Sequence, residues 1–194
     1  MAKFYDEGFD PDDFSIKVSE LLVATADSSD ELIDGAVTEV LALLRERLNM
    51  DVVFVSEFLD GERVFRYVEN PPGNPLLPVG GSDPLEETWC QRVVDGRMPE
   101  LIPNYADLPA KVKDEAPKPP FDIGTHLSTP IVVDGGQVYG TLCCFSFSPH
   151  ENVQQRDLKN LKSVAMLVAS KLKKTRPKQL ADVEQQPLGL QPKY

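Results

Sequence analysis

The sequence predicts an α+β domain in which helices pack on an antiparallel β-sheet. Residues 51–68 form two β-branched and aromatic runs around Asp60-Gly61, and residues 125–148 form two more around Asp134-Gly135-Gly136. Each pair predicts a β-hairpin, because short turns rich in Asp and Gly join antiparallel neighbours. Amphipathic helical patterns precede the first hairpin and follow the second. These helices are therefore expected to cover a sheet face.

Two helices are expected before the first hairpin. Residues 12–26 carry apolar side chains at helical spacing. Residues 28–49 keep one apolar face throughout, which makes this the clearest helix in the sequence. Ser28 and Glu31 have the spacing of a capping box, and Asn49 is a suitable C-terminal cap.

The sequence patterns that indicate secondary structure are weaker in the middle of the chain. Residues 70–84 are rich in proline and glycine and predict a loop. A short helix is expected over residues 85–95, since Pro84 suits a first helical position and Gly96 suits a terminator. A short strand over 100–102 precedes a polar, proline-rich loop at 103–120.

The last helix is expected over residues 153–174, after strands at 125–133 and 137–148. Its apolar residues alternate at spacings of three and four, which is typical of a coiled-coil seam: Leu158, Leu161, Ala165, Val168 and Leu172. The predicted organisation is a flexible N-terminus (1–11), one folded domain (12–174) and a disordered C-terminal tail (175–194).

Composition limits the classes of partner and the compartment. The 194 residues carry a net charge of −11 and a pI of about 4.6, which disfavours nucleic acid and anionic membranes as partners. No apolar stretch approaches the length that a bilayer requires. The three cysteines include the adjacent pair Cys143-Cys144, which favours a reducing compartment. Acidic residues stand where a signal peptide would be apolar, so a cytoplasmic protein is expected.

Three segments resemble the GAF domain family. They are the strand Asp51-Val52-Val53-Phe54-Val55-Ser56-Glu57-Phe58, the helix and turn at 87–99, and the closing hairpin at 123–146. The resemblance covers most of residues 15–173. It implies a profilin- or PAS-like antiparallel sheet with flanking helices, in which the N- and C-terminal helices pack together. It also implies a pocket on one side of the sheet and pairing of the terminal helices between subunits.

The resemblance implies a sensory module in signal transduction rather than an enzyme. The expected chain is a stand-alone GAF sensor that binds an unidentified small molecule or a partner and forms a homodimer through its terminal helices. With no output domain recognised, it either acts on another protein or belongs to a larger receptor. The family includes sensors of cyclic nucleotides, bilins, haem, metals and metabolites, so no particular cofactor is predicted. No catalytic residue and no metal cluster is predicted either.

Six residues form the candidate ligand pocket: Glu57, Trp89, Cys90, His126, Tyr139 and Thr141. Cys90 is interpreted as a redox sensor, a bilin attachment site or a small buried hydrophobe. His126 is a candidate haem ligand or hydrogen-bond donor, or else a partly exposed histidine bonded to a backbone carbonyl. Trp89 is expected either to stack on a planar ligand or to pack the helix.

Two alternative functions follow from the family. Free methionine sulfoxide reductases of the GAF type use one cysteine on the central helix, which Cys90 matches, and another in the following loop. Residues 103–124 contain no cysteine, which disfavours this activity because a resolving thiol is required. A chromophore or haem sensor is the other alternative, although Gln91 stands where bilin-binding relatives usually carry histidine.

Overall fold

A six-stranded antiparallel sheet forms the centre of the structure, a computed structural model that describes residues 18, 20 and 30–184. The strand order across the sheet is β3-β2-β1-β6-β5-β4, and every neighbouring pair is antiparallel. The strands are β1 (Val52–Leu59), β2 (Glu62–Glu69), β3 (Ser82–Pro84), β4 (Leu101–Ile102), β5 (Thr125–Val132) and β6 (Val138–Ser146). The predicted fold class is therefore confirmed.

Local turn chemistry fixes the first hairpin and the helix before it. Asp60 and Gly61 both adopt positive φ, at 51° and 83°, as the tight turn between β1 and β2 requires. Asn49 also has positive φ, and the Met50 amide donates to the Arg45 carbonyl. This left-handed cap ends α2 (Asp30–Leu48) where the sequence predicted.

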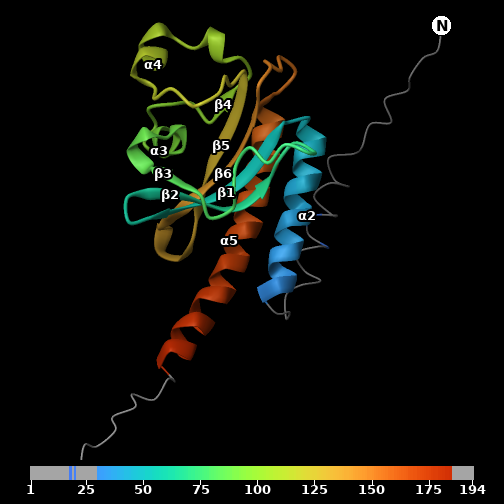
Figure 1. Cartoon of the computed structure of the whole chain (residues 1–194), viewed down its shortest axis with the longest axis vertical. Helices are drawn as coiled ribbons and strands as arrows, with labels where there is room; N and C mark the ends of the chain where they lie inside the picture. Colours follow the sequence, from blue (N-terminus) through green and yellow to red (C-terminus); the bar gives the residue numbers. More distant parts are fainter. Residues whose placement is uncertain (1–17, 19, 21–29, 185–194) are drawn as a thin grey trace, which may run out of the picture.

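Two long helices cover one face of the sheet, while the shorter helices lie on the other side (Figure 1). Helices α2 and α5 (Gln155–Glu184) pack against the sheet and against each other, and their buried side chains form one continuous core with those of the strands. Along β1, Val53 and Val55 face this core, whereas Phe54 belongs to a second cluster on the opposite face.

The predicted coiled-coil seam packs inside the domain, against the sheet and α2. The seam residues Leu158, Leu161, Ala165 and Val168 are all buried in the core that α5 forms with the sheet and α2. Alternating spacings of three and four suit a helix on a sheet as well as a helix on a helix. Met166, on the same helix, is 75% exposed.

Several boundaries differ from those expected. Thr88 adopts an extended conformation that splits the predicted helix into η1 (Leu85–Glu87) and α3 (Trp89–Val94), and its side chain caps α3 by accepting from the Gln91 amide. The predicted loop at 103–120 contains η2 (Tyr105–Asp107) and α4 (Ala110–Glu115), which lack an apolar stripe long enough to recognise.

The last helix extends to Glu184, beyond the expected end at Lys174. Residues 175–184 contain Lys, Arg, Gln, Leu, Ala and Glu, all good helix formers, around the proline that suggested a stop. Of the predicted helix at 12–26, only Val18 and Glu20 are described. Both are helical, and Val18 is buried in the core. The proposed cap Ser28, the 1–11 segment and residues 185–194 lie outside the described residues.

None of the helices in the described part of the chain combines the length and the hydropathy needed to cross a lipid bilayer.

Candidate functional site

A cavity of about 720 Å³ lies against the sheet face that α2 and α5 leave uncovered. Four phenylalanine rings line it, from β1, β2, β6 and the segment before β5: Phe54, Phe65, Phe145 and Phe121. Residues 76–78, 81–84 and 117–121 form further walls, together with the start of α3. The cavity is therefore enclosed by segments that lie far apart in the sequence.

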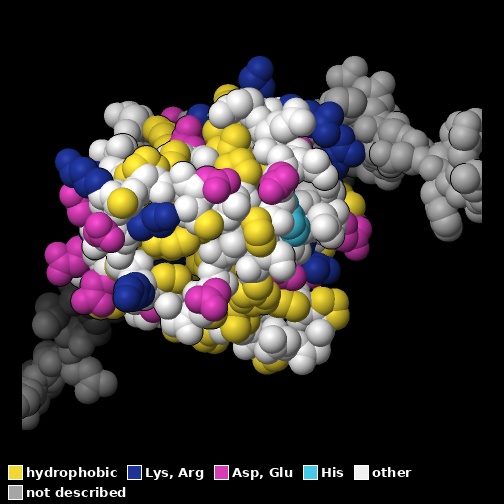
Figure 2. All heavy atoms as spheres, turned by 90° about the horizontal axis from the view of Figure 1, so that it is seen from above, with side chains coloured by type: hydrophobic (Ala, Val, Ile, Leu, Met, Phe, Trp, Pro, Cys, Tyr) yellow, Lys and Arg dark blue, Asp and Glu magenta, His cyan; other side chains and the backbone are white. Residues whose placement is uncertain are grey.

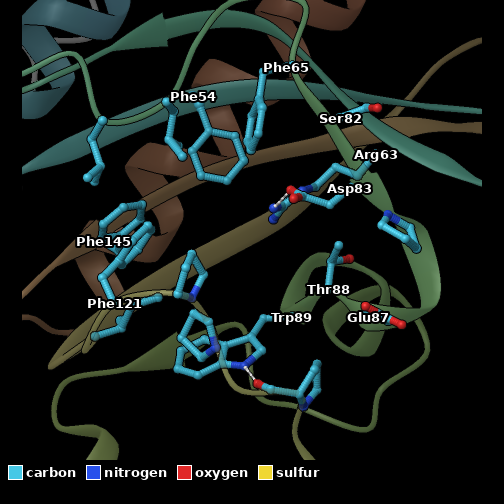
Figure 3. A pocket seen from close by; sticks show the side chains of 18 of the residues that line it. Phe54, Arg63, Phe65, Ser82, Asp83, Glu87, Thr88, Trp89, Phe121 and Phe145 are labelled. Atoms are coloured by element: carbon cyan, nitrogen blue, oxygen red, sulfur yellow. Dashed lines mark hydrogen bonds and ion pairs between the residues drawn. The ribbon is translucent and has the colours of Figure 1, made fainter.

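The rings are arranged in two pairs. Phe54 and Phe65 meet edge to face with centroids 5.1 Å apart, and Phe121 stacks on Phe145 at 5.2 Å. Figure 3 shows these four rings around one part of the cavity, with the ion pair of Arg63 and Asp83 beside them. A mainly apolar and aromatic lining with a smaller number of polar groups is typical of small-molecule sites.

Arg63 is the central charged group of the site. Arg63 on β2 is paired with Asp83 on β3 in the sheet, and the two side chains form an ion pair. Its guanidinium carbon also lies 4.7 Å from the Phe65 ring centroid and 5.6 Å from that of Phe54. Among the described residues, its Nε is buried without a hydrogen-bond partner. The guanidinium is therefore held in place but retains one free donor.

Trp89 contributes one wall of the cavity. Its indole stacks on Tyr105 with centroids 5.0 Å apart, and its Nε1 donates to the Pro117 carbonyl at 2.8 Å. The same residue was predicted to belong to the pocket, and the structure places it in the lining. Trp89 also ties α3 to the proline-rich segment 117–121, which forms the adjacent wall.

His126 also lines the cavity, and it is only 3% exposed. The expectation of a partly exposed histidine bonded to a carbonyl is therefore wrong. Its ring meets Trp89 edge to face at 5.3 Å, and within the described structure its Nδ1 has no hydrogen-bond partner. Burial, with a smaller contribution from the Arg63 charge, lowers the pKa of His126 to about 3. The imidazole is thus neutral at physiological pH.

Two predicted residues, Cys90 and Thr141, are fully buried and do not belong to the lining of the cavity. The sulfur of Cys90 lies 3.3 Å from that of Cys143, and Arg63 Nη1 donates to it at 3.4 Å. Thr141 Oγ1 lies 3.1 Å from the Cys143 sulfur and 2.9 Å from Ser56 Oγ. Together these groups form a buried polar row that crosses from α3 to β1.

The remaining two predicted residues, Glu57 and Tyr139, lie outside the cavity. Glu57 accepts from Arg66 Nε at 2.6 Å, and Tyr139 packs against the core formed with α2 and α5. Burial and the nearby Glu57 carboxylate raise the pKa of Tyr139 to about 12. This second group of polar residues is separate from the candidate site.

Sequence reasoning missed the phenylalanines and the Arg63–Asp83 pair. One signal was available for part of this set. Phe54 and Phe65 belong to strands joined by the Asp60-Gly61 turn, so the predicted hairpin already placed them on neighbouring strands. The contribution of Phe121 depends on the path of a loop, for which the sequence carries no periodic signal.

Comparison with known proteins identifies the family. A profile described as GAF domain matches residues 30–173, so the chain belongs to the GAF domain family, whose members are regulatory and sensory modules. No match was found among curated protein sequences.

Solved structures with the same fold include sensor domains and an enzyme. The GAF domain of a phosphoenolpyruvate-protein phosphotransferase from Coxiella burnetii superposes with a TM-score of 0.66 at 18% identity, covering 86% of this chain and 95% of that one. The chromophore-binding domain of a bacteriophytochrome from R. palustris gives 0.64 at 14% identity, covering 90% and 64%. Free methionine-R-sulfoxide reductase from Neisseria meningitidis, in complex with its substrate, gives 0.64 at 14%, covering 91% and 98%.

Proposed function

We propose that this chain is a non-enzymatic GAF sensor that binds a small planar molecule in the cavity beside Arg63. The supporting observation is the cavity itself, whose volume of about 720 Å³ and aromatic lining are those of a small-molecule site. Of its four charged residues, Arg63 and Asp83 form an ion pair, and the exposed Glu87 and Lys118 carry opposite charges. The site therefore favours an apolar, planar molecule with a few polar atoms over a highly charged one.

Two buried atoms indicate where polar atoms of the ligand bind. Arg63 Nε and His126 Nδ1 are both buried without a partner among the described residues, and both side chains line the cavity. An unsatisfied buried polar atom costs about 1–3 kcal/mol, which a ligand recovers by bonding to it. Because both atoms are covered in this structure, the proposal requires a small shift of the side chain before a ligand carbonyl or ring nitrogen can bond to Arg63 Nε.

The sheet is the proposed route from the cavity to the long helices. Phe54 and Phe145 face the cavity, while their strand neighbours Val53 and Cys144 belong to the core shared with α2 and α5. A ligand that favours one position of these strands would also favour one packing of the helices. This proposal requires no new contact between the ligand and the helices.

A homodimer through the terminal helices remains part of the proposal. The buried seam does not support it, since those side chains are used within one chain. The support on α5 is Met166, a large apolar side chain that is 75% exposed. Sedimentation of the full chain against a Met166→Glu variant tests this point. A wild-type monomer at high concentration would exclude the dimer.

The alternative functions receive less support. A covalent bilin would require an accessible thiol, and Cys90 is fully buried in this structure. A reductase of the free methionine sulfoxide kind is tested by an activity assay with a Cys90→Ser control, in which we expect no turnover. A visible absorption spectrum of protein from its native host tests for haem or bilin, and we expect no band.

Native mass spectrometry of the freshly purified full chain is the first test of ligand binding. We expect a retained small molecule that is lost on denaturation. Because Trp89 is the only tryptophan and lines the cavity, its fluorescence also reports occupancy. Titration with anilinonaphthalene sulfonate, an aromatic probe that carries one sulfonate group, should change the Trp89 emission.

A matched pair of variants locates the bound probe. Ser82 is exposed and lines the cavity, so Ser82→Phe should fill part of it and weaken binding. Ser163→Phe places the same ring on the exposed surface of α5 and should leave binding unchanged. Equal binding by both variants and the wild type would show that the probe does not occupy this cavity.

A further inference from the structure

Two of the three cysteines are in direct contact, although 53 residues separate them. Cys90 is on α3, Cys143 is on β6, and their sulfur atoms lie 3.3 Å apart. A disulfide bond has a sulfur–sulfur distance near 2.05 Å, so bond formation requires an approach of about 1.3 Å. The fold therefore already holds the two thiols in contact.

The surroundings of the two thiols differ in a way that suits a reaction between them. Cys90 faces the Arg63 guanidinium, with Nη1 at 3.4 Å. The Cys143 hydrogen bond and the Arg63 charge lower the pKa of Cys90, against the opposing effect of burial. Burial and the neighbouring Cys90 raise the pKa of Cys143. The Cys90 thiol therefore ionises more readily than an ordinary cysteine, whereas the Cys143 thiol keeps its proton.

The cavity provides a route for a small oxidant to this pair. Cys90 is fully buried, but the Arg63 side chain that contacts it also lines the cavity. A molecule of the size of hydrogen peroxide that enters the cavity can therefore contact the same side chain that contacts the Cys90 sulfur. The guanidinium also forms the ion pair with the Asp83 carboxylate.

We propose that Cys90 and Cys143 form a peroxide-reactive thiol pair that closes to a disulfide between α3 and β6. The Cys90 thiolate attacks one peroxide oxygen, the O–O bond breaks, and the leaving hydroxide takes a proton from solvent. The sulfur is thereby oxidised to a sulfenic acid, and the peroxide is reduced. The Cys143 thiol then attacks that sulfur, the S–O bond breaks, and water leaves with the Cys143 proton.

Cys144 provides an internal control on the neighbouring position. It belongs to the core on the other face of the sheet, and burial raises the pKa of its thiol. Alternation along β6 directs its side chain away from Cys90. If this geometry governs the reaction, Cys90 must form its disulfide with Cys143 and not with the adjacent Cys144.

The test uses the full chain treated with hydrogen peroxide, followed by alkylation of free thiols in denaturant and intact-mass analysis. We expect the loss of two hydrogen atoms and alkylation of one cysteine only, both reversed by dithiothreitol. In Cys144→Ser, the same loss should occur with no thiol left to alkylate, which assigns the bond to Cys90 and Cys143. Free Cys90 and Cys143 after treatment, or a bond to Cys144, would overturn the proposal.

Two further variants test the mechanism. In Cys143→Ser, the sulfenic acid has no resolving thiol and should be trapped by dimedone on Cys90. At pH 5, below the Cys90 pKa of about 6, Arg63→Met should slow disulfide formation severalfold, because the thiolate fraction falls by up to about tenfold for each unit by which the thiol pKa rises. Circular dichroism shows whether each variant is folded. The disulfide test on the wild-type protein does not depend on these variants. An unchanged rate in folded Arg63→Met would contradict the role assigned to the guanidinium.

Discussion

The backbone of Gly140 lies against the carbonyl of Ser56 so closely that a Cβ atom at position 140 would stand 1.9 Å from that oxygen. Gly140 is in β6 and pairs with β1, the two central strands of the sheet. The absence of a side chain at this position therefore allows the two strands to approach.

Gly140→Ala should destabilise the fold by more than about 3 kcal/mol, because the contact is with backbone and not with a movable side chain. Urea unfolding followed by circular dichroism measures this change. The matched control is Gly35→Ala, at an exposed position of α2 with open space around the added atom, which should stabilise by up to about 1 kcal/mol. Similar effects of both substitutions would contradict the close approach.

Thr141→Val should cost about 1–3 kcal/mol of unfolding free energy, since it removes a hydroxyl that lies 2.9 Å from the buried Ser56 Oγ. Replacing both partners leaves no unpaired hydroxyl. The double variant Ser56→Ala/Thr141→Val is therefore expected to lose less stability than the sum of the two single variants. Strict additivity would mean that the hydroxyls do not interact.

His126 should make the protein less stable as the pH falls below about 6.5. The pKa of His126 is lowered to about 3 in the folded chain, so the unfolded chain binds the proton first. The stability contribution is complete above pH 6.5 and is lost progressively down to about pH 3. At pH 5 the loss is about 2 kcal/mol by this linkage.

Urea unfolding of wild type and His126→Gln at pH 7.5 and pH 5 isolates this effect from the titration of carboxylates. His150→Gln is the control, because it removes the other histidine of the chain. Only His126→Gln should show a smaller loss between the two pH values. An equal loss in all three proteins would mean that His126 becomes protonated without unfolding.

Arg63→Met should raise the pKa of Cys90, because the guanidinium that donates to its sulfur is lost. The ultraviolet absorbance of the thiolate, taken as the difference between each protein and its Cys90→Ser counterpart, measures this pKa. Arg63→Lys keeps the positive charge and should retain part of the effect. Identical titration curves for Arg63→Met and wild type would show that the charge does not act on Cys90.

Much of the fold was accessible from the sequence because local chemistry determines it. The Asp60-Gly61 turn and the Asn49 cap both require positive φ, and the structure has it at these residues. The division of the 85–95 helix was missed. It depends on Thr88, whose side chain caps the first turn of α3, and the available signal was the capping-box spacing of Thr88 and Gln91.

The candidate site was predicted less completely, for reasons of register. Tyr139 and Thr141 are two residues apart and would share one face of a regular strand. An irregularity in the pairing of β5 with β6, next to Val132, adds a residue here, so Tyr139 packs toward the helices. The contact between Cys90 and Cys143 joins a helix and a strand that are distant in sequence, and no local pattern encodes it.

Three prolines, at 117, 119 and 120, stand in the wall that Trp89 fastens to α3. Each proline ring fixes one backbone torsion and restricts the residue before it. This wall consequently has few alternative conformations and loses little conformational entropy when a ligand binds. A preorganised boundary of this kind reduces the entropic cost of complex formation, so tight association requires only a modest contact area.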